Sequence, residues 1–265
     1  MKPYVFFLLL YSLFRHTQAE YPRNSIPIGP GYSVYRCDND QESLMRDVHN
    51  SIKRFFPGLV TEIRKGVAGS KYGFEAFFLS NDNINPVVET FSRILDQEKV
   101  MIRGRPERIL FVCVNADDQQ PQIATFYQQW RTQVEQRQAS GRSLEDAEKE
   151  STVALSITPD SNAILLYPTF FALPALPNRK RDCPVVKRTF SGGFSLPGVT
   201  QLQDSMYGTA IHELVHKYLH LSVQDVDEAR TVADSMNLPA EKQVQNAANY
   251  AFLACGKHSS PILPS

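Results

Sequence analysis

The sequence predicts one α+β domain that is mainly helical and carries a small sheet. Amphipathic helical segments lie near both ends of the chain, and short continuously apolar runs typical of strands lie between them. The sequence contains no internal repeat. The order of its expected elements is helices, a few strands, then helices, and this order favours an α+β fold. Removing a predicted leader of 19 residues leaves enough chain for one substantial core or two small ones.

The N-terminal residues 1–19 have the pattern of a secretory signal peptide. Lys2 provides a short positive start, a largely apolar run covers 5–14, and Thr17-Gln18-Ala19 offers a cleavage site. The apolar run is too short to span a bilayer, although a retained anchor is the alternative. We therefore expect a secreted, extracellular protein with no other membrane segment.

The segment after the leader is expected to be extended, and the domain is expected to begin at Cys37. Residues 20–36 are rich in Pro and Gly and indicate an extended lead-in. A helix should follow, because one apolar stripe repeats at helical spacing: Leu44, Val48, Ile52 and Phe55. An Asp/Asn cluster starts this helix, and Pro57-Gly58 is expected to end it.

The middle of the chain alternates between predicted helices and strands. Residues 86–102 and 121–138 have helical composition, and Pro86 falls in the first turn of the former. The apolar run at 108–114 is more typical of a strand. The polar residues 139–151 indicate an exposed loop or a solvated helix.

Two further strands and a helical C-terminal part complete the expected domain, which spans 37–257. The strands are predicted at 151–158 and 162–168, with a turn at Pro159-Asp160. A basic loop follows at 178–198, and its dibasic pairs are either solvated or processing sites. From residue 204 the chain is expected to be helical with one interruption, and 258–265 to be a flexible tail.

Charge and cysteine content narrow the class of protein. The 28 basic and 28 acidic residues balance, so nothing recommends nucleic acid or an anionic membrane as partner, and we expect a monomer.

Four cysteines in a secreted chain indicate two disulfides, for which three pairings exist. We favour Cys37–Cys113 with Cys183–Cys255, because each bond would close one half of the chain.

The stretch TAIHELVHKYLH at 209–220 concentrates the candidate chemistry. At 100° per residue its apolar side chains fall on one arc, which should pack into a core. The other arc should face a cleft or solvent and is polar: Thr209, His212, Glu213, His216, Lys217 and His220. This arc is either a metal site or the solvated face of an ordinary amphipathic helix.

The H-E-x-x-H spacing within this stretch predicts a zinc site. His212 and His216 lie one turn apart, about 6 Å along the axis, so both imidazoles can bind one ion. Glu213 points beside the metal, where it can accept a proton from zinc-activated water and pass it to a leaving amine. We expect one Zn²⁺ ion as cofactor, no organic cofactor site, and peptide or protein substrates.

A catalytic zinc needs a third protein ligand. His220 lies about 12 Å of rise beyond His212, so it cannot reach the same ion. The remaining candidates are the carboxylates where the helix should end: Asp225, Asp227 and Glu228.

These segments resemble those of the fungal deuterolysin-like metallopeptidases, the aspzincins, which include lysine-specific metalloendopeptidases. TAIHELVH is similar to the family's run into its metal helix, and NAILLYPTFFALP (162–174) to its strand with Pro-x-Phe-Phe. NAANY (246–250) is similar to its Asn-Ala-Asp-Asn-Tyr segment, and YRCDNDQESLMRDV (35–48) to the start of its catalytic domain. The resemblance implies a zincin-like fold and His212, His216 and Asp225 as zinc ligands, because Asp225 lies nine residues after His216.

Three departures from the family pattern qualify this resemblance. Glu228 stands where the family has a tyrosine that helps to hold the oxyanion, and losing such a donor costs roughly 2.7–4 kcal/mol. Ala248 replaces the aspartate of the lysine-specific members, so strict lysine specificity is not expected. The stretch between Ala19 and Cys37 has no room for a long propeptide.

The expected function is that of a secreted zinc endopeptidase of the aspzincin type, with Glu213 as general base and acid. A strand around 162–167 is the candidate to bind substrate in extended form. The alternative, favoured by Glu228, is a non-catalytic secreted zinc-binding protein, either a scavenger or a pseudo-protease. A disulfide-bonded interaction protein without metal is the third possibility.

Overall fold

The computed structural model describes residues 24–66, 74–116, 120–149, 151–157, 161–176, 187–188, 194–195, 205–219, 228–229 and 231–259. The predicted signal peptide 1–19, the turn at Pro159-Asp160 and most of the basic loop lie outside these residues. The final helix continues to Ser259, so the first two residues of the predicted tail are helical. No helix in the described ranges is long and apolar enough to cross a membrane.

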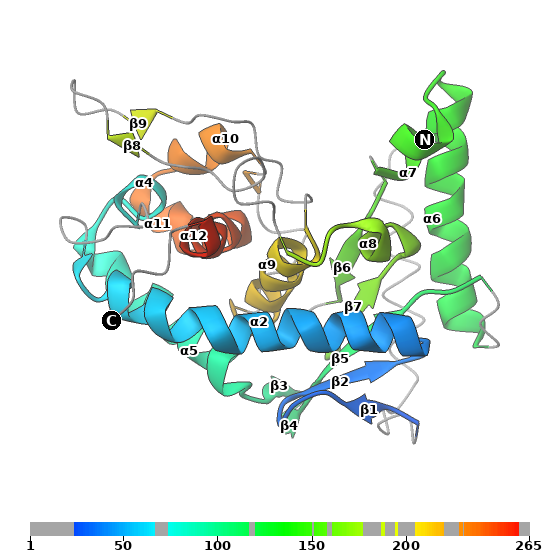
Figure 1. Ribbon diagram of the computed structural model, residues 1–265, viewed down its shortest axis with the longest axis horizontal. Helices are drawn as coiled ribbons and strands as arrows, with labels where there is room; N and C mark the ends of the chain where they lie inside the picture. The colour runs from blue at the N-terminus through cyan, green and yellow to red at the C-terminus, as the bar shows by residue number, and fades with distance from the viewer. Residues whose placement is uncertain are drawn as a thin grey trace.

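A five-stranded mixed sheet lies beside the helical part of the molecule (Figure 1). Its strands in spatial order are β1 (Ile26–Pro27), β2 (Tyr32–Tyr35), β5 (Ile109–Cys113), β7 (Ala163–Leu166) and β6 (Ala154–Ser156). The three inner strands are parallel, and the two outer strands run antiparallel to their neighbours. The predicted strands at 108–114, 151–158 and 162–168 therefore pair in one sheet, and the predicted α+β class is confirmed.

Both faces of the sheet are covered, so its inner strands are apolar on both sides. Along β5 the side chains alternate between two cores: Ile109 and Phe111 face the larger core, while Leu110 and Val112 face the smaller one. The smaller core is closed by α6 (Pro121–Ala139), which lies with α7 (Leu144–Lys149) on the other side of the sheet (Figure 1). This two-sided burial explains why the strand appears in the sequence as an unbroken apolar run.

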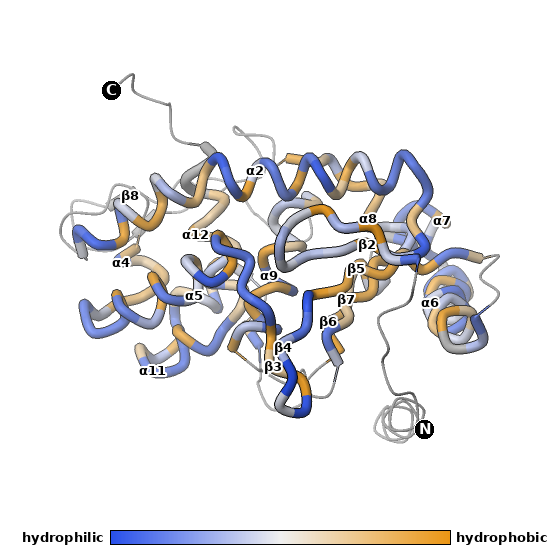
Figure 2. Tube along the Cα trace, turned by 90° about the horizontal axis from the view of Figure 1, so that it is seen from below, coloured by the Kyte–Doolittle hydropathy of each residue, from blue (hydrophilic) through white to orange (hydrophobic). Residues whose placement is uncertain are grey.

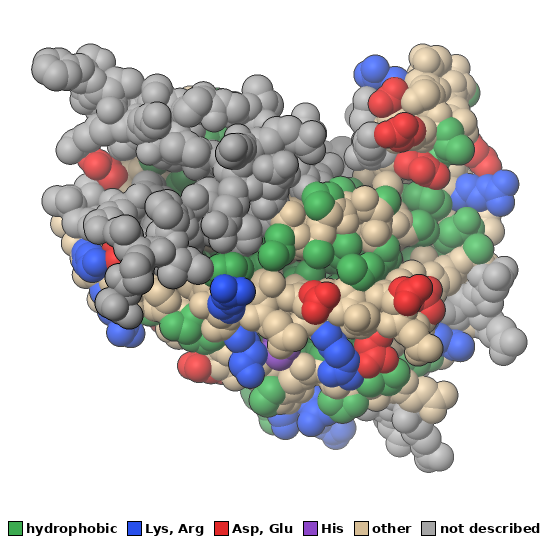
Figure 3. All heavy atoms as spheres, viewed as in Figure 1, with side chains coloured by type: hydrophobic (Ala, Val, Ile, Leu, Met, Phe, Trp, Pro, Cys, Tyr) green, Lys and Arg blue, Asp and Glu red, His purple; other side chains and the backbone are tan. Residues whose placement is uncertain are grey.

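The larger core lies between the other face of the sheet and the remaining helices. The long helix α2 (Asn39–Ile63) crosses the molecule from the sheet to the helical part, and its hydrophobic and hydrophilic residues alternate along its length (Figure 2). It packs against α5 (Ile84–Asp96), α9 (Met206–Leu219) and α12 (Ala247–Ser259). In Figure 3, charged side chains lie along α2, and hydrophobic ones gather above it near α8 (Pro168–Ala172).

The expected end of α2 at Pro57-Gly58 is wrong, because the helix continues for six residues beyond Pro57. Pro57 itself is exposed, whereas Leu59 and Ile63 in the following turns are fully buried. Proline in a helix interior removes one hydrogen bond and costs about 3 kcal/mol. Burial of the apolar side chains beyond it offsets that cost, at roughly 1.5–3 kcal/mol for each fully buried side chain.

The predicted extended lead-in is part of the sheet. Residues 32–35 form β2, which pairs with β1 on one side and with β5 on the other. Tyr32 and Val34 point into the larger core, so this short Pro- and Gly-flanked segment is fixed by tertiary packing. The Pro- and Gly-rich composition of this segment gave no indication of the four-residue strand that the structure has there.

The helix predicted at 86–102 ends earlier than expected. Helix α5 stops at Asp96, and Gln97 adopts a left-handed conformation with φ 54° as its C-cap. Val100–Ile102 forms strand β3, which pairs with β4 (Arg105–Glu107) in a hairpin. The side chain of Val100 is buried in the larger core, which stabilises the strand over a further helical turn.

Short elements complete the described chain. The predicted exposed region at 139–151 contains the helix α7 (Leu144–Lys149). The C-terminal part has more interruptions than the single one expected, since α10 (Val232–Met236) and α11 (Ala240–Gln243) precede α12. The remaining short elements are α4 (Phe74–Phe77), the 3-10 helix η1 (Asn81–Asn83), β8 (Lys187–Arg188) and β9 (Phe194–Ser195).

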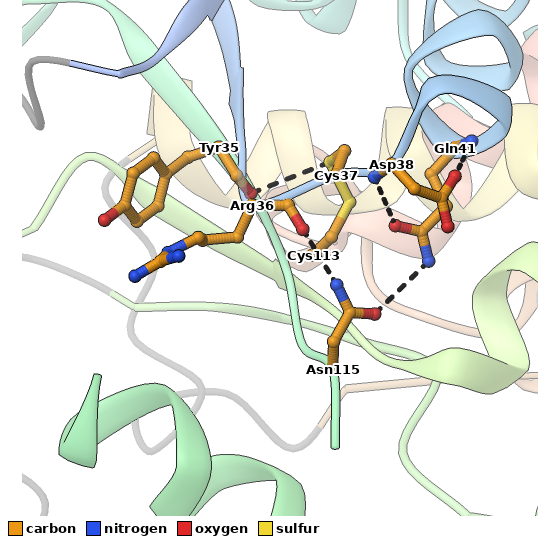
Figure 4. Close-up of a disulfide and its surroundings, with 7 residues drawn as sticks. All are labelled: Tyr35, Arg36, Cys37, Asp38, Gln41, Cys113 and Asn115. Atoms are coloured by element: carbon orange, nitrogen blue, oxygen red, sulfur yellow. Dashed lines mark hydrogen bonds between the residues drawn. A yellow bond between two sulfur atoms is a disulfide. The ribbon is translucent and has the colours of Figure 1, made fainter. Parts of the chain in front are cut away.

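One of the two predicted disulfides is present, between Cys37 and Cys113 (Figure 4). It joins the start of α2 to the end of β5 across 76 residues. The bond lies beside a helix cap: the Asp38 carboxylate accepts from the Gln41 backbone N–H at 2.8 Å, and the Gln41 side chain accepts from the Asp38 N–H. Cys255 is buried in α12, but Cys183 lies outside the described residues, so that pairing stays a prediction.

Candidate metal centre

Helix α9 carries the H-E-x-x-H residues and lies between the sheet and the helical part of the molecule (Figure 1). Ser205 precedes its first residue, and the Ser205 hydroxyl accepts a hydrogen bond from the Gly208 backbone N–H at 3.1 Å. This bond satisfies one of the free N–H groups at the helix start. The helix packs on α12, α5, α2 and β6, so it is surrounded by structure on several sides.

The polar arc of α9 is mostly buried, which differs from the solvent- or cleft-facing arc expected from its sequence. Glu213, His216 and Lys217 are all buried, and His212 is only partly accessible. Strand β6 and the residue after it cover this side of the helix. The interpretation of the arc as an ordinary solvated face is therefore wrong, because Glu213, His216 and Lys217 are buried.

Two side chains, Ser156 and Lys217, hold β6 and the segment after it against α9. The Ser156 hydroxyl donates to the Glu213 backbone carbonyl at 2.8 Å. One turn further along, the Lys217 ammonium donates to the backbone carbonyls of Ile157 and Ser161 at 2.5 and 3.0 Å. Burial lowers the pKa of Lys217 to about 7, while the Glu213 charge acts in the opposite direction.

Three potential ligand atoms, from His212, His216 and Glu228, lie close together beside this contact. The Nε2 atoms of His212 and His216 lie 3.1 Å apart. The Glu228 Oε1 atom lies 3.2 Å from the former and 3.3 Å from the latter. These residues form the group of potential metal ligands found in the described part of the chain.

The geometry of this triangle fits a zinc ion. Zinc bonds of roughly 2.0–2.2 Å in a tetrahedron place neighbouring ligand atoms about 3.3–3.6 Å apart. The three observed separations are close to this edge length and nearly equal, as expected for atoms arranged around one shared cation. Two imidazole nitrogens and one carboxylate oxygen are also an established ligand set of catalytic zinc, with the fourth position left for water or substrate.

The charge state of Glu228 suits a metal ligand. Burial raises the pKa of this carboxyl, but the nearby His212 and His216 side chains outweigh that effect and hold its pKa well below its usual value. The carboxylate is therefore ionised at neutral pH. A carboxylate together with two imidazole nitrogens is a ligand set that suits a divalent cation.

Glu213 lies next to this triangle in sequence but projects toward a different group of residues. Its carboxylate is close enough to Tyr167 and Lys217 to affect both: burial raises the pKa of Tyr167 beyond its usual range and the Glu213 charge adds to that rise. Tyr167 follows directly after β7, so the end of this strand lies near Glu213. The Glu213 carboxylate is thus buried near Lys217 of α9 and near the end of β7.

Several predicted site residues lie outside the described chain. Asp225, Asp227 and His220 are among them, so their positions relative to the metal ligands stay predictions. Glu228 was one of three carboxylates that the sequence placed after the helix, and the structure brings it to the histidines. Ala248, at the family's specificity position, is fully buried in α12.

The comparisons with known proteins were sparse. No family model and no curated protein matches the chain. Among solved structures, it is similar to a zinc peptidase from Grifola frondosa with a TM-score of 0.47 and 13% sequence identity. The match covers 82% of this chain and 96% of that one. At this level of similarity, any function must be argued from the site's own residues.

Proposed function

We propose that this protein is a secreted zinc-dependent endopeptidase whose metal is held by His212, His216 and Glu228. The observation that carries this proposal is the triangle of three ligand atoms at 3.1, 3.2 and 3.3 Å, with Glu213 on the same helix. The H-E-x-x-H spacing alone supplies two ligands and a base. Glu228 supplies the third ligand that the motif lacks.

The roles of the residues follow from their chemistry. Bound zinc would polarise the substrate carbonyl and the attacking water. Glu213 would accept a proton from that water as its oxygen bonds to the carbonyl carbon. When the carbon–nitrogen bond breaks, Glu213 would return the proton to the leaving amine. The buried position of Glu213 keeps its carboxylate in place between the two transfers.

The expected substrate strand needs a correction. The segment around 162–167 forms β7, which pairs with β5 on one side and β6 on the other. Its backbone is already hydrogen-bonded on both sides, so it cannot add a peptide. Strand β6 lies at the edge of the sheet and contacts α9, so an extended substrate would pair with β6.

Secretion forms part of the proposal. The leader-like residues 1–19 support it, and so does the Cys37–Cys113 disulfide, because such bonds persist in oxidising compartments. Mass spectrometry of the protein recovered from culture medium would show the mature N-terminus. Recovery of the full-length chain from the cell interior would contradict secretion.

Peptide cleavage by zinc-loaded wild type and zinc-loaded Glu213→Gln tests the catalytic claim. Both proteins should bind one zinc, because Glu213 is not a ligand. Only the wild type should cleave a peptide library, and the variant should lose at least about a hundredfold in rate. Equal rates for the two proteins would show that Glu213 is not the base.

Zinc retention by carboxylate variants tests the ligand assignment. Glu228→Gln should weaken zinc binding at least tenfold, since it removes a charged ligand, whereas Asp225→Asn and Asp227→Asn should not. Dissociation constants from competition with a chromogenic chelator provide the measurement. Strong loss in Asp225→Asn with normal binding by Glu228→Gln would instead support the ligand implied by the aspzincin resemblance.

A non-catalytic zinc-binding protein is the second candidate function. Glu228 favours it, because a ligand carboxylate occupies the sequence position where the related peptidases have an oxyanion-holding tyrosine. In that case zinc-loaded wild type would bind the metal as described but cleave no peptide above the Glu213→Gln background.

A further inference from the structure

The NAANY segment contributes its asparagines to the protein interior. Asn246 and Asn249 are 1% and 0% exposed, and Ser235 of α10 is also fully buried beside them. We call Ser235, Asn246 and Asn249 the asparagine network. Buried polar side chains are costly unless they are hydrogen-bonded, so the partners of this network indicate what it does.

The network converges on the backbone directly after the proposed metal ligand. The Ser235 hydroxyl donates to the carbonyl of Ala229 at 3.0 Å. The Asn246 amide donates to the same Ala229 carbonyl at 3.2 Å. Ala229 is the residue next to Glu228, so two buried side chains hold the chain at the position from which the Glu228 side chain projects.

The network is itself anchored to distant parts of the fold. The Asn246 amide donates to the Asn249 side-chain oxygen at 2.6 Å. The Asn249 amide in turn donates to the carbonyl of Phe77 at 2.6 Å, at the end of α4. The chain around Ala229 is thereby tied to α4, α10 and α12, and α12 packs against the metal helix α9.

We propose that Ser235, Asn246 and Asn249 are positioning residues that set the place of the Glu228 carboxylate in the metal site. This inference rests on the proposed function, and it gives the two asparagines of the NAANY segment a role in positioning a metal ligand. Residues 220–227 lie between the end of α9 and Glu228, so the ligand does not project from the metal helix itself. Fixing the Ala229 carbonyl limits the movement of the backbone that bears the ligand.

Zinc affinity of Ser235→Ala and Asn246→Ala tests this proposal. Both changes remove a hydrogen bond to the Ala229 carbonyl without touching a ligand. Groups that orient metal ligands typically affect metal affinity by about 10- to 100-fold, and we expect a loss in this range. The measurement is the zinc dissociation constant by chelator competition, at a temperature where the zinc-free form of each variant is fully folded.

Matched controls separate this effect from a general loss of packing. Ser151→Ala removes another buried hydroxyl that donates to a backbone carbonyl, that of Ala147, on the α6 and α7 side of the molecule. Asn83→Ala removes a buried amide that donates to the carbonyl of Ala240. Both controls should lower thermal stability and leave the zinc dissociation constant within about twofold of wild type.

A double variant provides a readout that a purely structural role would not change. In the Glu228→Gln background, Ser235→Ala should have no further effect on the remaining zinc affinity, because the ligand it positions is gone. Equal effects of Ser235→Ala in both backgrounds would overturn the proposal, as would wild-type affinity in the single variants. If Asn246→Ala does not fold, Ser235→Ala decides the question alone.

The outcomes for the two proposals are distinguishable. Failure of the wild type to bind zinc would overturn the proposed function and this inference together. Normal zinc binding and cleavage by the wild type, with unchanged zinc affinity in Ser235→Ala, would overturn this inference and leave the proposed function intact.

Discussion

Lys217 carries an ammonium group into the core immediately after the second histidine of the metal site. Only 2% of the residue is exposed, and its ammonium group is hydrogen-bonded to the backbone carbonyls of Ile157 and Ser161. A buried amine favours its neutral form, which explains the lowered pKa of about 7. At the residue scale, one side chain thus joins the metal helix to the loop between β6 and β7.

The lowered pKa of Lys217 makes stability depend on pH in a defined window. Between about pH 7 and pH 10 the unfolded chain keeps the proton on this lysine and the folded protein releases it, so stability rises with pH. We expect zinc-free wild type to gain stability relative to Lys217→Met across this window, on the order of 1.4 kcal/mol per pH unit.

Urea unfolding of both proteins at pH 7 and pH 9.5 provides the measurement. The exposed Lys242→Met serves as control, and its stability relative to wild type should stay constant. If the free energies of unfolding of wild type and Lys217→Met differ by the same amount at both pH values, the lowered pKa of Lys217 is contradicted.

Helix α2 shows how packing determines the extent of an element. Its first turn is fixed locally by the Asp38–Gln41 capping box. Its last two turns follow Pro57, and the Thr61 hydroxyl donates to the Pro57 carbonyl at 2.9 Å. The helix is retained beyond the proline because the side chains that follow are part of the larger core.

Because proline is unfavourable inside a helix, we expect Pro57→Ala to stabilise the protein. Alanine restores a backbone N–H and removes the ring's clash with the preceding turn, and the exposed position loses no core contact. Allowing for the greater freedom of the unfolded chain, the gain should be about 1–2 kcal/mol. Thermal unfolding would show it as a higher midpoint, while the exposed Lys53→Ala in the same helix should change little. A lower midpoint for Pro57→Ala would contradict this account.

At the scale of the whole molecule, the sheet separates two cores, and the disulfide joins the start of α2 to the end of the central strand. Cys37 begins the segment leading into α2, and Cys113 ends β5, the central strand of the sheet. Asn115 forms two hydrogen bonds beside the disulfide (Figure 4). Its side-chain amide donates to the Arg36 carbonyl at 2.8 Å, and its side-chain oxygen accepts from the Gln41 amide at 3.4 Å. The disulfide therefore fixes the sheet to the helix that spans both parts of the molecule.

Removal of this disulfide should cost about 4 kcal/mol, the chain-entropy value for a loop of 76 residues. The change is Cys37→Ala with Cys113→Ala, and the measurement is the free energy of unfolding in urea. Each single variant should lose about as much as the pair, because either one breaks the bond. A loss below about 1 kcal/mol in the double variant would contradict a structural role.

The sequence by itself determined the local features of this protein. The H-E-x-x-H helix follows from helical periodicity, the strands around 109–113 and 163–166 from short apolar runs, and the helix from Pro121 from its composition. The order of these elements predicts the α+β class. The pairing of Cys37 with Cys113 was favoured among three possible pairings, and the structure confirmed it.

The tertiary structure alone decided which distant residues meet. It brought Glu228 to the histidines, placed Lys217 against the β6–β7 loop, inserted β2 into the sheet and carried α2 past Pro57. Local spacing encodes secondary structure because its hydrogen bonds join near neighbours. Ligand sets and strand partners depend on the packing of residues far apart in sequence, which single-sequence patterns do not encode.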